Sequence, residues 1–287
     1  MRDLILFGDC KQNLSAFLPN TARMCVTSPP YYGLRDYGGE EKQIGQENTP
    51  EEYIQNLVEV FREVREVLTD DGTLWVNIGD SYYNYRPGKA YVKQTVASNN
   101  QDLPEYSPKR SRKLDGIKEK DLIGIPWMLA FALRADGWYL RQDIIWHKPN
   151  PMPESVKDRC TKSHEYIFLL SKRQNYYFDV DAIKEPTRRK RSVWNVAKKP
   201  YRGSHFAVFP PELIVDCIKA GSEKGDCVLD PFMGSGTTAM VSKSLGRDYI
   251  GCELHEDYGN LIQQRIGEYH PVEEVSQETT VNILDLI

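Results

Sequence analysis

Short apolar runs alternate with longer amphipathic stretches over most of the chain. The apolar runs, several of which end in Gly-Asp or in Pro, predict strands at 4–7, 23–27, 73–78, 139–147, 165–171, 227–229 and 249–252. Apolar residues at helical spacing predict helices at 50–70, 121–136, 211–220, 239–245 and 258–269. Strands that alternate with helices favour an α/β domain with a mainly parallel sheet.

The first long helix has the clearest start signal. Thr49 can cap its N-terminus, Pro50 suits the first helical position, and the next two residues are acidic. Asp71-Gly72 predicts the end of this helix and the start of the next strand.

Two polar segments interrupt the alternation. Residues 81–120 are rich in Asn, Pro and Lys and predict a long loop. Residues 174–204 lose periodicity, and the part from Ile183 to Arg202 carries eight basic residues against a single acidic one, Glu185. A concentration of positive charge of this kind is compatible with a local contact to a polyanion.

The composition of the 287 residues, 40% hydrophobic and 27% charged, is that of an ordinary globular protein. A net charge of −4 argues against a protein that coats nucleic acid non-specifically. No apolar run approaches the roughly 18 residues of a membrane span, and the first nine residues predict a strand rather than a secretion signal, so we expect a cytoplasmic protein. The six cysteines and five histidines have no metal-ligand spacing, which predicts neither a disulfide framework nor a structural metal.

A glycine-rich turn, here called the glycine loop (residues 230–238), follows the strand predicted at 227–229. Gly234 and Gly236 have no side chains, so backbone N–H groups can approach a ligand closely. Glu253, at the end of the next predicted strand, can accept hydrogen bonds from both hydroxyls of a ribose. The loop therefore favours an adenosine-containing ligand.

Several classes of ligand can be compared at the glycine loop. A phosphate-binding P-loop requires Lys where this chain has Thr237, whereas a dinucleotide fingerprint fits loosely. Asp230 and Glu253 would repel a pyrophosphate and suit a ligand with a cationic amino-acid part. The structural alternative is a strand–turn–helix whose glycines serve packing alone.

A second motif, here called the Ser-Pro-Pro-Tyr turn (residues 28–31), ends the strand predicted at 23–27. Its two prolines remove two N–H donors and stiffen the chain, which leaves carbonyl oxygens beside a hydroxyl and an aromatic ring. Such a cluster can accept hydrogen bonds from an amino group and stack on a planar ring. It lies at the carboxyl end of a strand, where open α/β sheets bind ligands.

Together the two motifs resemble those of the amino-group DNA methyltransferases, and their order, with the Ser-Pro-Pro-Tyr turn first, is that of the β group. Gly8-Asp9, residues 205–210 and Gly251–Glu253 resemble further pieces of that family. The resemblance implies a Rossmann-like methyltransferase fold: a mainly parallel seven-stranded sheet with one antiparallel strand, helices on both faces, and a small inserted recognition region.

The resemblance also implies a role for each motif residue, with S-adenosyl-L-methionine as methyl donor, S-adenosyl-L-homocysteine as product, and no metal. Ser28 and the Pro29 carbonyl accept hydrogen bonds from the target amino group, within a turn stiffened by Pro30, and Tyr31 stacks on the extruded base. The residues implied in cofactor binding are Asp9, Thr27, His205, Phe206, Pro210, Asp230, Pro231, Phe232, Gly234, Ser235, Gly236, Thr237, Thr238 and Glu253.

Duplex DNA is the implied partner, and the basic segment is the predicted contact with it, because arginines suit guanine edges and lysines suit phosphates. The residues concerned are Arg188, Arg189, Lys190, Arg191, Lys198, Lys199 and Arg202. Lys109, Arg110, Arg112 and Lys113 could form a second DNA-facing loop or a plain solvated one. For Trp194 we expect core packing.

These roles divide the chain into four parts. Residues 1–174 form the first part of the catalytic domain with the target-amine site, and 175–204 the basic inserted DNA-recognition region. Residues 205–270 form the second part with the cofactor loop, and 271–287 an acidic tail. The resemblance is compatible with a cognate restriction endonuclease as a second partner, and with a monomer or a homodimer that is encoded by a prokaryotic cell or by a phage.

The choice of base also comes from the resemblance. In the family, Ser at the first motif position goes mostly with the N4 amino group of cytosine, and Asp or Asn with the N6 amino group of adenine. Cytosine N4 is therefore favoured, with adenine N6 as the alternative. Methylation at ring carbon 5 requires a cysteine after proline, and the chain contains no Pro-Cys pair. More distant alternatives are an NAD-dependent oxidoreductase, a methylase of RNA or protein glutamine, and an inactive DNA-binding relative.

Overall fold

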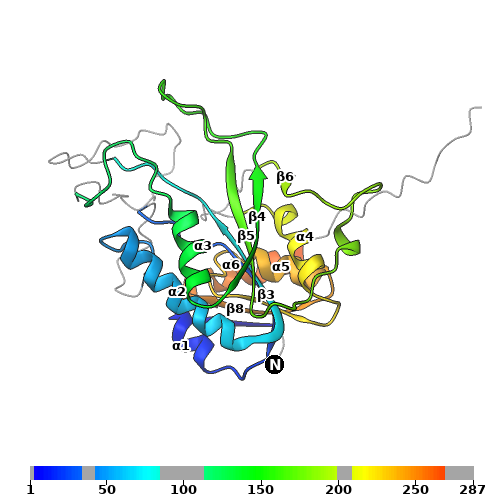
Figure 1. Cartoon of the computed structure of the whole chain (residues 1–287). Helices are drawn as coiled ribbons and strands as arrows, with labels where there is room; N and C mark the ends of the chain where they lie inside the picture. Colours follow the sequence, from blue (N-terminus) through cyan, green and yellow to red (C-terminus); the bar gives the residue numbers. More distant parts are fainter. Residues whose placement is uncertain (1–2, 34–42, 85–112, 199–208, 269–287) are drawn as a thin grey trace, which may run out of the picture.

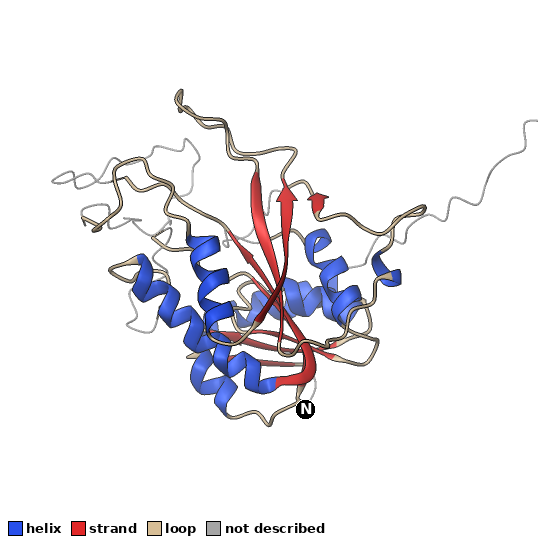
Figure 2. Cartoon of the chain, viewed as in Figure 1, coloured by secondary structure: helices blue, strands red, loops and turns tan. Residues whose placement is uncertain are grey.

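The computed structural model describes residues 3–33, 43–84, 113–198 and 209–268. In these ranges eight strands form one sheet in the order β1-β8-β7-β2-β3-β5-β4-β6 (Figures 1 and 2). Strand β5 runs antiparallel to both its neighbours, and all other pairs are parallel. The strands are β1 (Leu4–Phe7), β2 (Ala22–Thr27), β3 (Leu68–Ile78), β4 (Tyr139–His147), β5 (His164–Ser171), β6 (Val193–Asn195), β7 (Cys227–Asp230) and β8 (Asp248–Glu253).

Three helices cover each face of the sheet (Figure 1). Helices α1 (Cys10–Ser15), α2 (Pro50–Val67) and α3 (Ile125–Ala135) pack on one face, over a core that includes Tyr53 and Phe61. Helices α4 (Pro211–Gly221), α5 (Thr237–Ser244) and α6 (Gly259–Glu268) lie on the other. The predicted α/β fold with a mainly parallel sheet and helices on both faces is confirmed.

Helix α2 begins as the sequence predicts but ends earlier. The Thr49 hydroxyl accepts a hydrogen bond from the Glu52 N–H at 3.1 Å, and Pro50 occupies the first turn. The predicted end at Asp71-Gly72 is wrong, because the chain is already extended at Leu68, where β3 pairs with Ala22 of β2. Burial of this pairing outweighs the helical spacing that reaches Leu68 in the sequence.

Helix α3 begins later than the predicted residue 121. Gly124 has a left-handed backbone, with φ 89°, and the Asp80 carboxylate accepts hydrogen bonds from the N–H groups of Gly124 and Ile125. A side chain from the end of β3 therefore fixes the start of this helix.

The sheet has one strand more than the expected seven, and the extra strand comes from the basic segment. Val193–Asn195 pairs in parallel with Ile145–His147 of β4, and the Trp194 side chain is buried under α4. The core role expected for Trp194 is confirmed. Three residues are too few to produce a periodic signal, so the sequence places them in an irregular insertion.

None of the six cysteines forms a disulfide. Within the described ranges, none of the helices combines the length and the apolar character that crossing a bilayer takes.

Candidate active site at the carboxyl edge of the sheet

The two sequence motifs meet at the point in the sheet where the crossover connections from two neighbouring strands run in opposite directions. From β7 the chain crosses through α5 to β8, whereas from β2 it crosses through α2 to β3 on the opposite face and in the opposite direction along the sheet. Strands β2 and β7 are direct neighbours, with Cys25 opposite Leu229. Open α/β sheets bind ligands in the crevice beyond such a switch point.

A buried network ties the two strand ends together. The Asp230 carboxylate accepts hydrogen bonds from the hydroxyls of Thr27 and Thr238, each at 2.6 Å, and from the Phe232 N–H at 3.0 Å. Thr27 and Asp230 lie 203 positions apart in the sequence. The Ser-Pro-Pro-Tyr turn and the glycine loop therefore start side by side.

The same network sets the pKa of the Asp230 carboxyl and limits this residue to a structural role. Burial raises the pKa of its carboxyl to about 6, although the three hydrogen bonds oppose this rise. Its side chain and those of Thr27 and Thr238 are buried beneath the loop. In this arrangement they position the loop backbone, and their own polar atoms face one another.

One glycine allows the close packing of the glycine loop, and the backbone of a second is anchored to the next strand. Gly236, with φ +82°, caps α5, and a Cβ there would lie 2.8 Å from the Ile262 side chain of α6. Gly234 donates its N–H to the Glu253 carboxylate at 2.8 Å. The buried Ser235 is held by Arg265 of α6, which donates to its carbonyl oxygen and its hydroxyl.

Glu253 and Asp9, both implied in cofactor binding by the resemblance, lie at the ends of the neighbouring strands β8 and β1. The Gly8 N–H donates to the Glu253 carbonyl oxygen at 2.8 Å, and the Asp9 side chain caps α1 by accepting from the Lys11 N–H. Burial raises the pKa of the Glu253 carboxyl to about 7, against the hydrogen bonds from the His255 and Gly234 N–H groups. Glu253 thus places an ionisable acceptor at the glycine loop.

The other residues implied in cofactor binding fall into three groups. Pro231 and Thr237 are buried within the loop, and Phe232 is half-buried. Pro210 is buried and precedes α4. His205 and Phe206 lie outside the described residues, as do Lys199 and Arg202 of the predicted DNA contact and Lys109, Arg110 and Arg112 of the second loop.

The Ser-Pro-Pro-Tyr turn is held by side chains from distant parts of the chain. The Tyr53 hydroxyl of α2 donates to the Pro30 carbonyl at 2.7 Å. The Tyr31 hydroxyl donates to the Glu165 carboxylate of β5 at 2.8 Å. Among the described residues, none donates a hydrogen bond to the Pro29 carbonyl, which leaves it as an acceptor in the turn.

The Tyr31 side chain is fixed on two sides. Gly79 lies so close to its ring that a Cβ there would sit 2.6 Å from Cε2. Burial raises the pKa of the Tyr31 hydroxyl well above its usual value, and the nearby Glu165 carboxylate raises it further. The tyrosine is therefore a neutral hydrogen-bond donor with a defined ring position.

Glu165 and Lys148 are site residues that the motifs do not include. They form an ion pair in which the Lys148 side chain is 6% exposed and that of Glu165 is 16% exposed. The Lys148 ammonium also lies 4.2 Å from the centre of the Trp146 ring. Burial lowers the pKa of Lys148 to about 8 although Glu165 raises it. The signal in the sequence is one acidic residue at the start of an otherwise apolar strand.

The predicted DNA contacts divide around β6. Residues 188–191 enter this strand at its amino end, where Arg188 pairs with Glu185 and Lys190 pairs with Asp216 of α4. Lys198 leaves the strand on the side of the carboxyl edge, and its backbone exchanges hydrogen bonds with the Asn150 side chain. Of the four residues at 188–191, the three arginines are exposed and Lys190 is half-buried.

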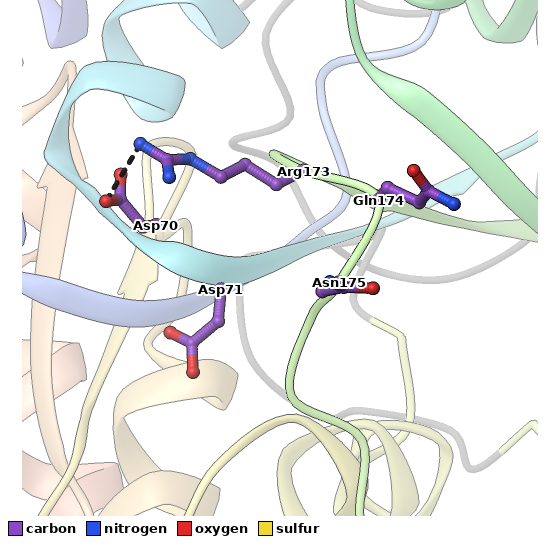
Figure 3. A pocket seen from close by; sticks show the side chains of 5 residues that line it. All are labelled: Asp70, Asp71, Arg173, Gln174 and Asn175. Carbon is purple, nitrogen blue, oxygen red and sulfur yellow. Dashed lines mark ion pairs between the residues drawn. The ribbon is translucent and has the colours of Figure 1, made fainter.

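A hollow of about 430 Å³ lies at the other end of β3 (Figure 3). Its charged groups are already neutralised, because Arg173 pairs with Asp70 at 2.9 Å and Asp71 pairs with Arg23 at 2.6 Å. It is remote from the carboxyl edge, and the site described above does not involve it. The described residues contain no cluster of three or more His, Cys, Asp or Glu side chains that could hold a metal ion.

Comparisons with known proteins agree with this geometry. The family model described as DNA methylase matches residues 22–264. The type II methyltransferase M.SmaI of Serratia marcescens is 50% identical over 269 residues, which cover 91% of this chain and 90% of that protein. M.Cfr9I of Citrobacter freundii is 50% identical over 269 residues, covering 90% and 86%.

Solved structures share the fold at low sequence identity. A putative DNA modification methylase of Thermus thermophilus, TTHA0409, in complex with S-adenosyl-L-methionine, superposes with a TM-score of 0.65 at 24% identity over 94% of this chain and 95% of that one. The PvuII DNA methyltransferase, described as cytosine-N4-specific, gives 0.64 at 18% identity over 94% of both chains.

Proposed function

Because this chain belongs to the DNA methylase family and is a type II methyltransferase of its N4/N6 class, we propose that it methylates the N4 amino group of a cytosine turned out of duplex DNA. The observation that carries the proposal is the bond between Thr27 and Asp230, which joins the starts of the two turns. A target amine at the Ser-Pro-Pro-Tyr turn and a donor at the glycine loop are then neighbours. Ser28 at the first motif position favours cytosine over adenine.

The target nitrogen is a poor nucleophile, since its lone pair is delocalised into the base. The Ser28 hydroxyl and the Pro29 carbonyl provide two acceptors for its two N–H groups, while Tyr53 occupies the Pro30 carbonyl. Hydrogen bonds to both N–H groups favour a pyramidal nitrogen with a localised lone pair. Acceptors fixed in advance act on the charge that develops during transfer and need no rearrangement.

The glycine loop fits an adenosine-containing methyl donor. Gly234 and Gly236 bring backbone close to a ligand, Glu253 offers acceptor oxygens to ribose hydroxyls, and Asp9 stands at the neighbouring strand end. S-Adenosyl-L-methionine supplies the methyl group and, as a sulfonium, a neutral leaving group. Asp230 and its two threonine partners act by holding the loop in this shape.

For the DNA contact we propose the surface nearest the carboxyl edge. The β4–β5 connection projects beyond the sheet there (Figure 1), carries Lys157 and Arg159, and lies next to Lys198. The exposed arginines at 188, 189 and 191 lie at the other end of β6 and add positive charge there. Extrusion of a base costs a few kcal/mol, which contacts to the phosphates on this surface offset.

The test is transfer of a labelled methyl group to unmodified genomic DNA, followed by mass analysis of the nucleosides. The expected product is N4-methylcytosine, and a Ser28→Ala variant serves as the inactive control. N6-Methyladenine would overturn the choice of base, and the absence of any methylated nucleoside would overturn the proposed function.

A further inference from the structure

A charged pair lies behind the Ser-Pro-Pro-Tyr turn and belongs to neither motif. Lys148 follows β4, Glu165 is near the start of β5, and the antiparallel register that pairs His147 with His164 brings them together. Burial of an ion pair is costly in itself, and replacement by apolar residues of similar size is often neutral or stabilising. The pair therefore adds little stability of its own, and the groups that it contacts point to a chemical role.

The hydrogen bonds around Tyr31 all run in one direction. Its hydroxyl has a single proton, and that proton is donated to Oε2 of Glu165 at 2.8 Å. The Lys148 ammonium binds the other carboxylate oxygen, Oε1. The Ser28 hydroxyl lowers the pKa of Tyr31, which is the effect of a hydroxyl that donates toward the Tyr31 oxygen, and since the Tyr31 proton is already used, Ser28 takes the donor role. The Ser28 oxygen is then left to accept from a target amine.

We propose, on the basis of the proposed function, that Glu165 is the final acceptor of the proton that the methylated amine loses, received through the hydroxyls of Ser28 and Tyr31. The amine lone pair forms the N–C bond, and the electrons of the broken C–S bond stay on sulfur, so the positive charge moves to nitrogen. One N–H proton passes to Ser28, the Ser28 proton to Tyr31, and the Tyr31 proton to the Glu165 carboxylate. Charge and protons balance without a further reactant, and exchange with solvent restores Glu165.

Lys148 acts in this scheme as a positioning residue. Its ammonium binds one carboxylate oxygen of Glu165 and fixes the group so that the other oxygen remains for Tyr31. Asn77 adds a weaker contact, with its amide nitrogen 3.4 Å from the same oxygen. The Trp146 ring beneath the ammonium shields the pair on one side. The lowered pKa of Lys148, about 8, agrees with a group in limited contact with water.

The decisive variants are Tyr31→Phe, which keeps the ring and removes the hydroxyl, and Glu165→Gln, which keeps the shape and removes the charge. We expect the single-turnover rate of methyl transfer at saturating cofactor to fall by about 10²-fold in each, in the range of general base catalysis. The dissociation constants for S-adenosyl-L-homocysteine and for duplex DNA should stay within about twofold. The solvent deuterium isotope effect of the wild-type reaction should disappear in both variants.

Asp216→Asn is the matched control, because Asp216 also pairs with a lysine, Lys190, that lies over a tryptophan ring. It should leave the methyl-transfer rate and the isotope effect unchanged. Glu165→Asp should recover part of the rate, and circular dichroism establishes that each variant is folded.

The proposal is overturned if folded Tyr31→Phe retains a single-turnover rate within threefold of the wild type, or an unchanged isotope effect. The wild-type product, analysed in the same reactions, tests the proposed function separately. A wild type that methylates adenine changes the base and leaves the comparison of variants intact. A wild type with no methyl transfer contradicts the proposed function itself.

Discussion

The two turns at the centre of this protein follow adjacent strands, yet they are held in different ways. The glycine loop is held by its own residues and by the ends of the neighbouring strands β2 and β8, since the Asp230 carboxylate binds two hydroxyls, one of them on β2, and a backbone N–H, and Glu253 binds the Gly234 N–H. The Ser-Pro-Pro-Tyr turn depends on side chains from α2 and β5, and one of these, Glu165, lies 134 positions from Tyr31.

The different ways of holding the two turns correspond to two different roles. In the proposed function the glycine loop offers its backbone to the methyl donor, and its side chains keep that backbone in one shape. The Ser-Pro-Pro-Tyr turn presents a hydroxyl, a carbonyl and a ring, each of which needs a defined orientation supplied from elsewhere. Substitutions in the first region should therefore change cofactor affinity, and those in the second should change methyl transfer.

The largest effect is expected for Ser28→Ala. Loss of one fixed polar group that acts on the reacting centre typically lowers the rate by about 10²–10³-fold. Affinity for S-adenosyl-L-homocysteine, measured by calorimetric titration, should remain within about twofold. The exposed Ser15→Ala provides a control with full activity. Loss of cofactor binding in Ser28→Ala would contradict the separation of the two regions.

Asp230→Ala tests the other region. It leaves the Thr27 and Thr238 hydroxyls and the Phe232 N–H without their acceptor, so the loop should loosen. We expect cofactor affinity to fall by at least about tenfold and the free energy of unfolding by about 1–3 kcal/mol, the cost of buried groups left unpaired. Asp230→Asn, which keeps one acceptor oxygen, should be milder in both. Unchanged cofactor affinity in Asp230→Ala, measured by titration, would remove the loop-holding role.

The same contrast explains how much the sequence predicts. Each turn is a contiguous motif at the end of an apolar run, so both turns, their strands and their meeting at one edge could be predicted, and the Thr27–Asp230 bond confirms the meeting. Glu165 and Lys148 become neighbours only through the register of β4 and β5. No spacing rule along the chain encodes that register, and for this reason the pair had no motif to identify it.

Strand β6 shows a second limit of sequence patterns. Its three residues lie within a basic, aperiodic segment, and their pairing with β4 depends on burial of Trp194 beneath α4. The ion pair of Lys190 with Asp216 likewise depends on this docking, so charge density alone cannot separate a DNA contact from a structural one.

Gly79→Ala should disturb the Ser-Pro-Pro-Tyr turn without touching its residues. The new Cβ would lie 2.6 Å from Cε2 of Tyr31, whose hydroxyl is bound to Glu165, so the ring must shift. We expect methyl transfer to fall about tenfold, on the scale of a misplaced reacting group, with cofactor affinity unchanged. Gly267→Ala is the control, since its added Cβ meets no atom within 4 Å. Wild-type turnover in Gly79→Ala would show that the ring position is not critical.

The smallest effect is a pH dependence of cofactor binding through Glu253. Burial raises the pKa of its carboxyl from 4.5 to about 7, so the group is mostly protonated at pH 6 and mostly ionised at pH 8. The ionised form is the better acceptor for ribose hydroxyls, so affinity for S-adenosyl-L-homocysteine should rise from pH 6 to pH 8, by about tenfold at most for a single group of this pKa. Stability changes in the opposite direction. Because the pKa of Glu253 is higher in the folded state, this group favours folding most below pH 4.5, and that contribution to the free energy of unfolding is lost as the pH rises through 7.

Calorimetric titrations at pH 6 and 8 measure the effect of Glu253 on binding. Glu253→Gln should bind S-adenosyl-L-homocysteine more weakly than the wild type at pH 8 and show the same affinity at both pH values. A pH dependence that persists in Glu253→Gln would assign the titration to another group and leave the glycine loop without an ionisable contact to the ligand.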